Sequence, residues 1–541
     1  MVRYDRAVVC LKHKMINAEI SGTSIIGGSR GAKGDDAFRA FDPRTGEPVG
    51  PDFFSVSIED LDRAVSLAAD ARIEFGNLFG KSKAAFLRQI AANLESLGDE
   101  LVERTSLETA LPAARIQSER GRTCSQLRLF ADVAEEGTWV DARIDHADPA
   151  RTPMPKPDVR SMLRPIGPVA IFCASNFPLA FSVAGGDTAS AFAAGCPVIV
   201  MAHPAHPGTA ELAASAIQDA VRSCGLPEGV FSLLFSNNYD IGQALVRRAE
   251  IKAVGFTGSR KGGRALMDIA AARPEPIPVY AEMSSVNPTF ILPSALAEKG
   301  EQIATGLHGS FTLGVGQFCT KPGLAFLSES GAIEGFTNKL AELTASTPAS
   351  PLLTGGIKTN YEQSTKARSG LQKAAAEAVT NGFAVSAELF ETTAERFLQD
   401  RELSEEVFGP AILLVTLGRP EQLLEIARSM EGQLTASIFG NLADLNDHAE
   451  LIAILETKVG RLIFNAFPTG VEVCHAMVHG GVYPATSDSR STSVGTRAIN
   501  RFARLVCYQG FPQEALPDEL KDKNPLGIWR LVDGALSNGS G

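Results

Sequence analysis

Residues 167–202 have the sequence GPVAIFCASNFPLAFSVAGGDTASAFAAGCPVIVMA, and this stretch decides the class of fold. The apolar runs at 167–175 and 196–202 are typical of buried strands. Between them, residues 182–195 are rich in small residues and have helical spacing. Because two parallel strands need a crossover connection, usually a helix, this order predicts an α/β fold with a parallel sheet.

The same alternation continues towards the carboxyl terminus. The next expected elements are strands at 230–236 and 251–258 and helices at 207–225 and 240–250. A second α/β half is expected from about Leu296 to Val482. Its expected elements are strands at 324–328, 411–417 and 460–466 and a helix at 391–399. Two sheets covered by helices are therefore predicted.

The two ends of the chain follow other patterns. Residues 21–55 are rich in Gly, Asp and Pro, which predicts an irregular segment with turns, whereas apolar residues recur at helical spacing from Ser57 to about Gly137. Residues 491–512 alternate in polarity, as an extended segment does. The final ALSNGSG is expected to be disordered.

Composition and charge exclude several classes of protein. A chain of 541 residues is expected to form two or three domains, at roughly 100–200 residues each. The net charge of −11, without a run of Lys and Arg, argues against a nucleic-acid partner. No apolar stretch approaches the ~20 residues that cross a bilayer, and the charged N-terminus does not resemble a signal peptide. We expect a cytoplasmic enzyme that does not bind membranes.

The eight cysteines are sparse and irregularly spaced. Neither a C-x-x-C pair nor a Cys/His zinc spacing occurs, so we expect no disulfide framework and no metal. The thiols are expected to stay reduced and mostly buried as small apolar groups.

Two residues outside the periodic pattern suit catalysis. Cys319 lies in GQFCTKPG (316–323), where Gly and Pro indicate an exposed turn whose N–H groups could activate a thiol. Glu282 follows the apolar VYA, at the carboxyl end of an expected strand, where partial burial would raise the pKa of a general base. A buried structural cysteine and a solvated loop glutamate are the alternatives.

Gly258 and Ser259 join an expected strand to an expected helix. Free N–H groups at such a turn can hold a phosphate, although many sheets have similar turns without a ligand.

Six motifs together resemble the aldehyde dehydrogenase superfamily, in the order and at the spacing of that family, across about residues 20–515. They are SNFPLAFSVAGGDTASAFAAGCPVIV (175–200), VGFTGSRKGGRAL (254–266), VYAEMSSVNP (279–288), GQFCTKPG (316–323), EEVFGP (405–410) and FPTGVEVCHAMVHGGVYPATSD (467–488). A narrower resemblance is to NADP-linked and 2,5-dioxopentanoate (α-ketoglutarate semialdehyde) dehydrogenases. It rests on AHPAHPGT (202–209), RPEPIPVYAEM (273–283) and MVHGGVYPATSD (477–488).

The resemblance implies a fold of two doubly wound parallel-sheet domains and a β oligomerisation arm, assembled as a homodimer or homotetramer. The implied divisions are a dinucleotide-binding domain (20–139 and 164–290), a catalytic domain (291–482), the arm (140–163 and 483–515) and a C-terminal tail (516–541).

The resemblance also implies a role for each motif residue. Cys319 would attack the aldehyde to form a thiohemiacetal, and the side-chain amide of Asn176 would stabilise the oxyanion. Hydride would pass to NADP or NAD and leave a thioester, which Glu282 would hydrolyse by activating water. Glu406 would bind the nicotinamide ribose, and Phe408 would support the nicotinamide ring.

The chain departs from the family pattern where the adenosine ribose is expected to bind. Met201 stands where a lysine is usual, and Pro204 stands where an acid often selects NAD. The nearby cationic candidates are His203, Arg260 and Lys261, so the cofactor could be NADP or NAD. After the base, Ser284 replaces a common glycine and could crowd the loop or form a hydrogen bond there.

Substrate residues are inferred from the implied tunnel. Arg122 and Gln126, one helical turn apart, would line its entrance, and Arg122 could bind the carboxylate of an oxo-acid semialdehyde. His479 could lie near Cys319. A surface arginine and an ordinary buried histidine are the alternatives.

Two other functions stay open from the sequence. An aliphatic or fatty aldehyde dehydrogenase would suit the aromatic residues Phe177, Phe181 and Phe318. A cofactor-poor, non-catalytic paralogue would suit Met201.

Overall fold

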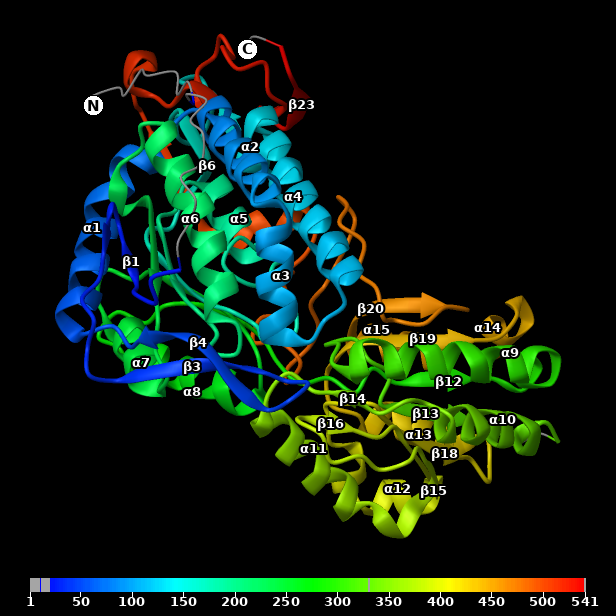
Figure 1. Ribbon diagram of the computed structural model, residues 1–541. Helices are drawn as coiled ribbons and strands as arrows, with labels where there is room; N and C mark the ends of the chain where they lie inside the picture. The colour runs from blue at the N-terminus through cyan, green and yellow to red at the C-terminus, as the bar shows by residue number, and fades with distance from the viewer. Residues whose placement is uncertain (1–9, 11–19, 329–330, 540–541) are drawn as a thin grey trace.

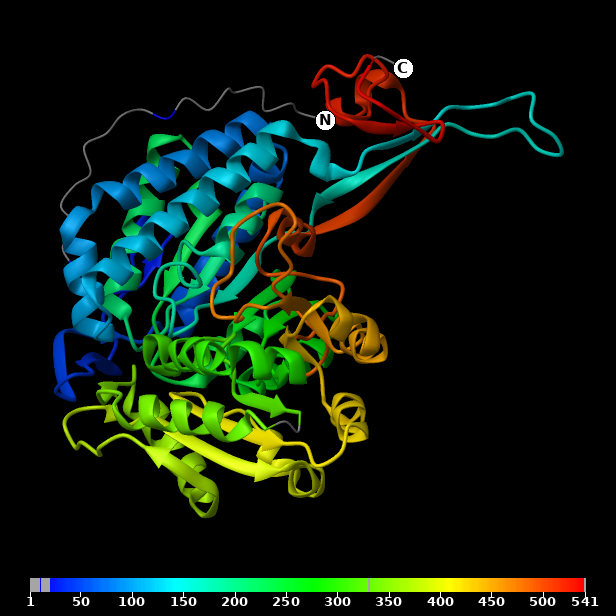
Figure 2. The same cartoon turned by 90° about the vertical axis from the view of Figure 1, so that its right-hand side faces the viewer.

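The computed structural model describes residues 10, 20–328 and 331–539. Two bodies are each built on a seven-stranded sheet, and a five-stranded sheet projects from the first body (Figures 1 and 2). Figure 2 shows the projecting sheet as an arm, in which an orange strand runs beside cyan ones and the red C-terminal segment packs at its side.

The first sheet has the order β11-β10-β7-β8-β9-β1-β2. Its strands are β1 (Ile25–Ile26), β2 (Ser29–Arg30), β7 (Val169–Phe172), β8 (Val198–Met201), β9 (Phe231–Leu234), β10 (Ala253–Thr257) and β11 (Val279–Glu282). The strands β7 to β11 are parallel, and β1 and β2 are added antiparallel at one edge. The strand order reverses between β7 and β10, which is the topological switch point where doubly wound sheets bind ligands.

Helices cover both faces of the first sheet (Figure 1). They are α1 (Ile58–Gly76), α2 (Gly80–Ser96), α3 (Gly98–Thr109), α4 (Ala113–Glu136), α5 (Gly186–Ala194), α6 (Pro207–Ser223), α7 (Tyr239–Arg247) and α8 (Arg260–Ala271). Because side chains alternate along a strand, Val169 and Ile171 join the core under α2, α4, α5 and α6, whereas Ala170 joins the core under α1, α7 and α8.

The second sheet has the order β15-β17-β18-β13-β12-β19-β20, and all its pairs except β15–β17 are parallel. Its strands are β12 (Thr289–Ile291), β13 (Leu324–Leu327), β15 (Gln372–Ala375), β17 (Glu388–Thr393), β18 (Ala411–Thr416), β19 (Gln433–Phe439) and β20 (Val459–Phe464). The helices of this body are α9 (Pro293–Thr312), α10 (Ile333–Ala345), α11 (Gly355–Ala367), α12 (Ala394–Gln399), α13 (Glu421–Ser429), α14 (Leu442–Asp447) and α15 (Ala449–Glu456). Since β12 already belongs to this sheet, the chain crosses between the bodies slightly before the division expected at 290/291.

The arm sheet has the order β21-β6-β5-β22-β23. Its strands are β5 (Arg143–Asp145), β6 (Val159–Pro165), β21 (Ala503–Gln509), β22 (Arg530–Val532) and β23 (Ala535–Ser537). Two small antiparallel pairs complete the strands, β3 (Ala37–Asp42) with β4 (Glu47–Phe54) and β14 (Ser350–Pro351) with β16 (Ala384–Val385). In the described residues β21 pairs only with β6, so its outer edge is open.

Short 3-10 helices occupy several connections. They are η1 (Thr138–Val140), η2 (Glu228–Val230), η3 (Leu313–Gly316), η4 (Ser369–Leu371), η5 (Arg401–Ser404), η6 (Thr496–Phe502), η7 (Gln513–Ala515) and η8 (Asp518–Leu520). No helix among the described residues is long and apolar enough to cross a membrane.

Two expectations about the chain ends were wrong. Residues 21–55 contain the four strands β1 to β4, whose pairing the local Gly and Pro content did not reveal. The C-terminal tail is ordered through Gly539, because the buried Arg160 donates to Asp522 and His146 bonds Asp533. Of the final ALSNGSG, Ser540 and Gly541 lie outside the described residues.

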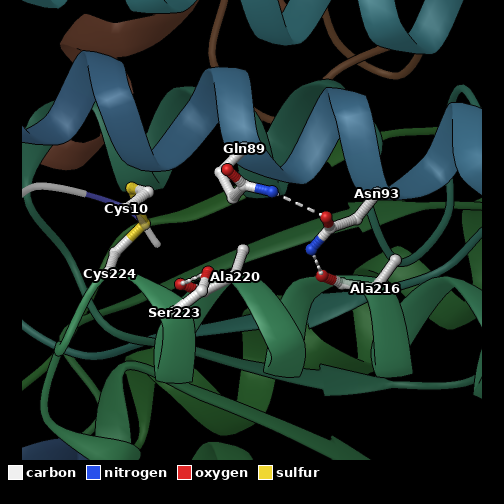
Figure 3. Close-up of a disulfide and its surroundings, with 7 residues drawn as sticks. All are labelled: Cys10, Gln89, Asn93, Ala216, Ala220, Ser223 and Cys224. Atoms are coloured by element: carbon white, nitrogen blue, oxygen red, sulfur yellow. Dashed lines mark hydrogen bonds between the residues drawn. A yellow bond between two sulfur atoms is a disulfide. The ribbon is translucent and has the colours of Figure 1, made fainter. Parts of the chain in front are cut away.

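The expectation of reduced thiols was also wrong for one pair. Cys10 and Cys224 form a disulfide across a sequence separation of 214 residues (Figure 3). Cys224 ends α6, beside the contact in which Asn93 of α2 donates to the Ala216 carbonyl at 2.9 Å. A pairing over this distance has no local spacing pattern, which is why the sequence did not reveal it.

Candidate active site

The candidate site lies where the carboxyl edge of the first sheet meets the amino edge of the second. Asn176 follows β7, Gly258 follows β10, and Glu282 ends β11. Cys319 lies in the loop that leads into β13, and Glu406 lies in the loop that leads into β18. All five residues line one cavity of about 500 Å³.

The loop of Cys319 depends on a close approach of two backbones. Gly316 has φ +66°, and a Cβ on this residue would lie 2.2 Å from the carbonyl oxygen of Gly409. Only glycine fits both the left-handed conformation and this spacing. From the other side, the Asn287 amide donates to the carbonyls of Cys319, at 2.8 Å, and Lys321, at 3.1 Å. The loop is thereby held between the segments that lead into β18 and β12.

His479 brings the expected nucleophile and base together. Its Nε2 lies 3.5 Å from the sulfur of Cys319 and 2.9 Å from Oε1 of Glu282. Ser493 donates to the other carboxylate oxygen of Glu282 at 2.8 Å. Because one nitrogen carries at most one proton, an Nε2–H that donates to the carboxylate cannot also accept the thiol proton. The shorter contact favours Glu282 as its partner.

The pKa of Glu282 is lowered, which corrects the expectation that it would be raised. Burial alone raises the pKa of this carboxyl group, but the charge and hydrogen bond of His479 and the hydrogen bond of Ser493 together outweigh burial. The sequence pattern indicated the burial and could not indicate these two partners.

Burial raises the pKa of the Cys319 thiol well above its ordinary value, and the negative charges of Glu282 and Glu406 add to this rise. Arg122 acts in the opposite direction. Burial and the two neighbouring carboxylates therefore favour the protonated form of the Cys319 thiol.

The buried Lys321 and the partly buried Glu406 lie near enough for each charge to affect the pKa of the other. The Lys321 ammonium donates to the carbonyls of Val407 and Ala411, each at 2.9 Å. Burial lowers the pKa of Lys321 to about 8, against the effect of Glu406, and raises the pKa of Glu406 to about 7, against that of Lys321. Ser284 hydrogen-bonds the Glu406 carboxyl group, which lowers its pKa, so this departure from the family supplies a contact.

Other expected residues lie at the same cavity. Asn176 donates from Nδ2 to the Gln317 carbonyl at 2.9 Å, and its amide carries a second N–H. Ser259 caps α8 by accepting from the Gly262 N–H at 3.2 Å. Phe408 and Gly258 complete the wall beside them.

Three of the expected cofactor residues are placed differently. Met201 is only 6% exposed and packs in the hydrophobic core, so it does not face the cavity. His203 lies on the cavity wall, but burial lowers its pKa to about 3, and its Nδ1 accepts from Ala205, so it is not a cation. Arg260 points to Glu431 and forms an ion pair with it at 2.8 Å.

The residues expected at the substrate tunnel also lie in different surroundings. Arg122 lies over the Phe181 ring and donates from Nη1 to the Val471 carbonyl, while its Nε and Nη2 are buried without a hydrogen-bond partner among the described residues. Gln126 is 2% exposed and packs against Gly186, so it is a core residue and not part of an entrance. Phe177 packs against Phe181 and Phe318, in an aromatic cluster that also contacts His479.

Three residues of the site were not predicted from the sequence. Lys321 was quoted only as part of a motif, and Ser493 gave no signal. Arg461, in β20, donates to the carbonyls of Gly470 and Pro468, and its Nε has no partner among the described residues. Burial lowers the pKa of Arg461, whereas the nearby Cys319 acts to raise it. An arginine inside an apolar strand was the available signal.

Comparisons with known proteins identify the family. The model of the aldehyde dehydrogenase family matches residues 31–502. Alpha-ketoglutaric semialdehyde dehydrogenase 2 of Azospirillum brasilense is 49% identical over 521 residues, which are 95% of this chain and 99% of that protein. The alpha-ketoglutaric semialdehyde dehydrogenase of Acinetobacter baylyi is 43% identical, over 96% of this chain and 99% of that protein.

Solved structures agree on the fold. Lactaldehyde dehydrogenase from Escherichia coli matches with a TM-score of 0.78 at 20% identity, over 90% of this chain and 98% of that one. Methylmalonate-semialdehyde dehydrogenase from Oceanimonas doudoroffii matches with a TM-score of 0.76 at 19% identity, over 91% of this chain and 98% of that one. The fold expected from the six motifs is confirmed, and the chain belongs to the aldehyde dehydrogenase family.

Proposed function

We propose that this aldehyde dehydrogenase oxidises 2,5-dioxopentanoate (α-ketoglutarate semialdehyde) to the corresponding dicarboxylate. The names of the two relatives described above support this substrate. The observation in this chain that carries the proposal is that Nε and Nη2 of Arg122 are buried without a hydrogen-bond partner among the described residues.

This edge of the Arg122 guanidinium suits a carboxylate. Nε–H and Nη2–H of an arginine point the same way and can bind both oxygens of a carboxylate in parallel. In Arg122 these are the two groups without a partner, whereas Nη1 is already held by Val471. A buried N–H needs an acceptor, and the acid end of a semialdehyde supplies one. The positive charge of Arg122 acts to lower the pKa of the Cys319 thiol, which supports a place for Arg122 near the reacting end of the substrate.

An apolar aldehyde is the competing substrate, and one observation favours it. Phe177, Phe181 and Phe318 form an aromatic cluster in this region. Such rings can bind an alkyl chain, but they would leave the Arg122 edge without an acceptor. The non-catalytic alternative rested on Met201, whose place in the core removes that argument.

The catalytic roles are proposed as follows. Cys319 gives its proton to the Glu282 carboxylate and attacks the aldehyde carbon, which forms a thiohemiacetal. The amide of Asn176 stabilises the oxyanion. The bound nicotinamide supplies the hydride acceptor for the oxidation. After Glu282 has released this first proton to solvent, its carboxylate takes a proton from water, whose oxygen attacks the thioester. The thioester bond breaks, the acid leaves, and the Cys319 thiolate takes the proton back from Glu282.

The cavity fits a nicotinamide dinucleotide. At about 500 Å³ it is within the usual range of ligand sites, and the start of α8 at Ser259 offers N–H groups to a phosphate. Its two carboxylate side chains, Glu282 and Glu406, lie with Cys319 at the reaction end. Because no acid stands at Pro204, we propose that the enzyme accepts NADP as well as NAD.

The substrate proposal is tested with Arg122→Met. Loss of a charged hydrogen bond of roughly 1.5–3 kcal/mol should lower kcat/KM for 2,5-dioxopentanoate about tenfold to a hundredfold, and leave kcat/KM for pentanal nearly unchanged. Arg128→Met is the matched control, since this arginine on the same helix pairs with Glu95 at the surface. An equal loss for both aldehydes would contradict the carboxylate contact.

The division of roles between nucleophile and base is tested by burst kinetics. Glu282→Gln should release one equivalent of reduced cofactor per active site, more slowly than the unchanged enzyme because the thiol has lost its proton acceptor, and then nearly stop, because hydrolysis needs the same base. Cys319→Ala should give no burst, and Cys474→Ala should behave like the unchanged enzyme. Normal steady-state turnover of Glu282→Gln would assign the base to another group.

Lys321 is expected to act as a positioning residue for Glu406. Lys321→Met leaves two buried carbonyls unpaired and should weaken cofactor binding about tenfold or more, as measured by the dissociation constants of NADP and NAD. Lys339→Met, on the surface of α10, is the control. Unchanged dissociation constants in a less stable protein would show a structural role only.

We further propose a homodimer or homotetramer that uses the open edge of β21. Leu505 on this strand is 68% exposed, and unpaired edges invite pairing with a second chain. Light scattering at micromolar concentration should give a mass of at least twice 57.3 kDa, and Leu505→Arg should reduce it. A monomeric mass of the unchanged protein would refute this assembly.

A further inference from the structure

Three side chains at the reaction centre have the composition of a metal site. One oxygen of Glu282, the sulfur of Cys319 and one ring nitrogen of His479 all lie within 4.8 Å of one another. They come from β11, from the loop before β13 and from the segment after β20. Among the described residues, this is the one group of three or more His, Cys, Asp or Glu side chains with such spacing.

We propose that this cluster binds Zn²⁺ and that the bound ion reversibly blocks the enzyme. Thiolate, imidazole and carboxylate are the three ligand types of protein zinc sites. Tetrahedral bonds of about 2.0–2.3 Å place ligand atoms roughly 3.3–3.8 Å apart. The sulfur of Cys319 lies 3.5 Å from Nε2 of His479, which in turn lies 2.9 Å from Glu282, so a small outward movement of the carboxylate completes the site.

The surroundings of these three side chains also suit a metal site. Ser493 holds the second oxygen of Glu282 at 2.8 Å, as outer partners orient metal ligands. Cys319 and Glu282 both line the cavity, so a fourth ligand such as water can enter from that side. Three protein ligands with one open position are typical of exchangeable zinc sites rather than structural ones.

Zinc at this position would occupy both reacting groups. On binding, the thiol proton leaves to solvent, and Nε2 of His479 also gives up its proton to solvent while Nδ1 keeps or takes one, so that the thiolate and the neutral imidazole both bond the metal. The electron pair of the thiolate is then no longer available to attack an aldehyde. The Glu282 carboxylate, as a ligand, can no longer take a proton from water. A soft thiolate ligand favours Zn²⁺ over Mg²⁺ or Ca²⁺, so the block should be selective. This inference rests on the ligand geometry and does not depend on which aldehyde is the substrate.

Co²⁺ is the spectroscopic probe for this site. Titration of the full-length protein with Co²⁺ should produce a sulfur-to-cobalt charge-transfer band, which Zn²⁺ removes by displacement. Cys319→Ala should abolish the band, and Cys474→Ala should retain it. Cys474 is the matched control because it is a partly exposed thiol next to His475, the other place where a thiol and an imidazole adjoin.

Zinc affinity is measured in parallel by competition with a chromophoric chelator. Cys319→Ala and His479→Gln should weaken Zn²⁺ binding more than about a hundredfold, and Ser493→Ala about tenfold, as loss of an outer partner does. Zn²⁺ should also raise the Tm of the unchanged protein and of Cys474→Ala, but not of Cys319→Ala, which separates loss of the site from loss of the fold.

The outcomes are decisive in either direction. A cobalt band that survives in Cys319→Ala, or that disappears in Cys474→Ala, would place the metal elsewhere and overturn the proposal. Zn²⁺ binding no tighter in the unchanged protein than in a folded Cys319→Ala would do the same. Inhibition that a chelator reverses, with Cys319 protected from alkylation while Zn²⁺ is bound, would support it.

Discussion

The buried ammonium of Lys321 is the interaction on which the reaction centre depends. A charge inside a protein is tolerated only when hydrogen bonds and an opposite charge compensate it. Lys321 meets this condition with two carbonyls of the Glu406 loop and with Glu406 itself. Because Lys321 is two residues from Cys319, these hydrogen bonds join the loop of Cys319 to the segment that contains Glu406. The close approach of the Gly316 and Gly409 backbones joins the same two segments.

Much of the fold could be predicted because local patterns determine it. The apolar runs became strands β7, β8, β9 and β10, since short apolar runs bounded by turn residues are typical of buried strands. Turn chemistry and a strand end drew attention to Cys319 and Glu282, but only the resemblance to the family selected them over a structural cysteine and a solvated glutamate. The carboxyl-end rule held for Glu282 in the first sheet. Cys319 and Glu406 instead lie at the amino edge of the second sheet, which only the docking of the two sheets brings to the same cavity.

The contacts that sequence reasoning missed are long-range and polar. Ser493 is 211 positions from Glu282, and no periodicity connects them. Lysine and arginine are rarely buried, so Lys321 and Arg461 would be assigned to the surface by composition alone. The side chain of Met201 points into the core because side chains alternate along the pleated strand β8. Its position near the end of that strand did not determine this direction. The pKa of Glu282 depended on two such partners, so its sign could not be predicted from burial.

The short strands at the C-terminus affect which edge of the arm sheet is open to a second copy of this chain. A flat sheet with two free margins can add a neighbour on each side, and such head-to-tail addition has no natural end. Here β22 and β23 lie at one edge of the arm sheet. The outermost strand, Ala535–Ser537, has three residues, so it offers few backbone groups for pairing with a second chain. Only the longer margin at β21 stays available. The tail therefore leaves the arm sheet with one long open edge among the described residues.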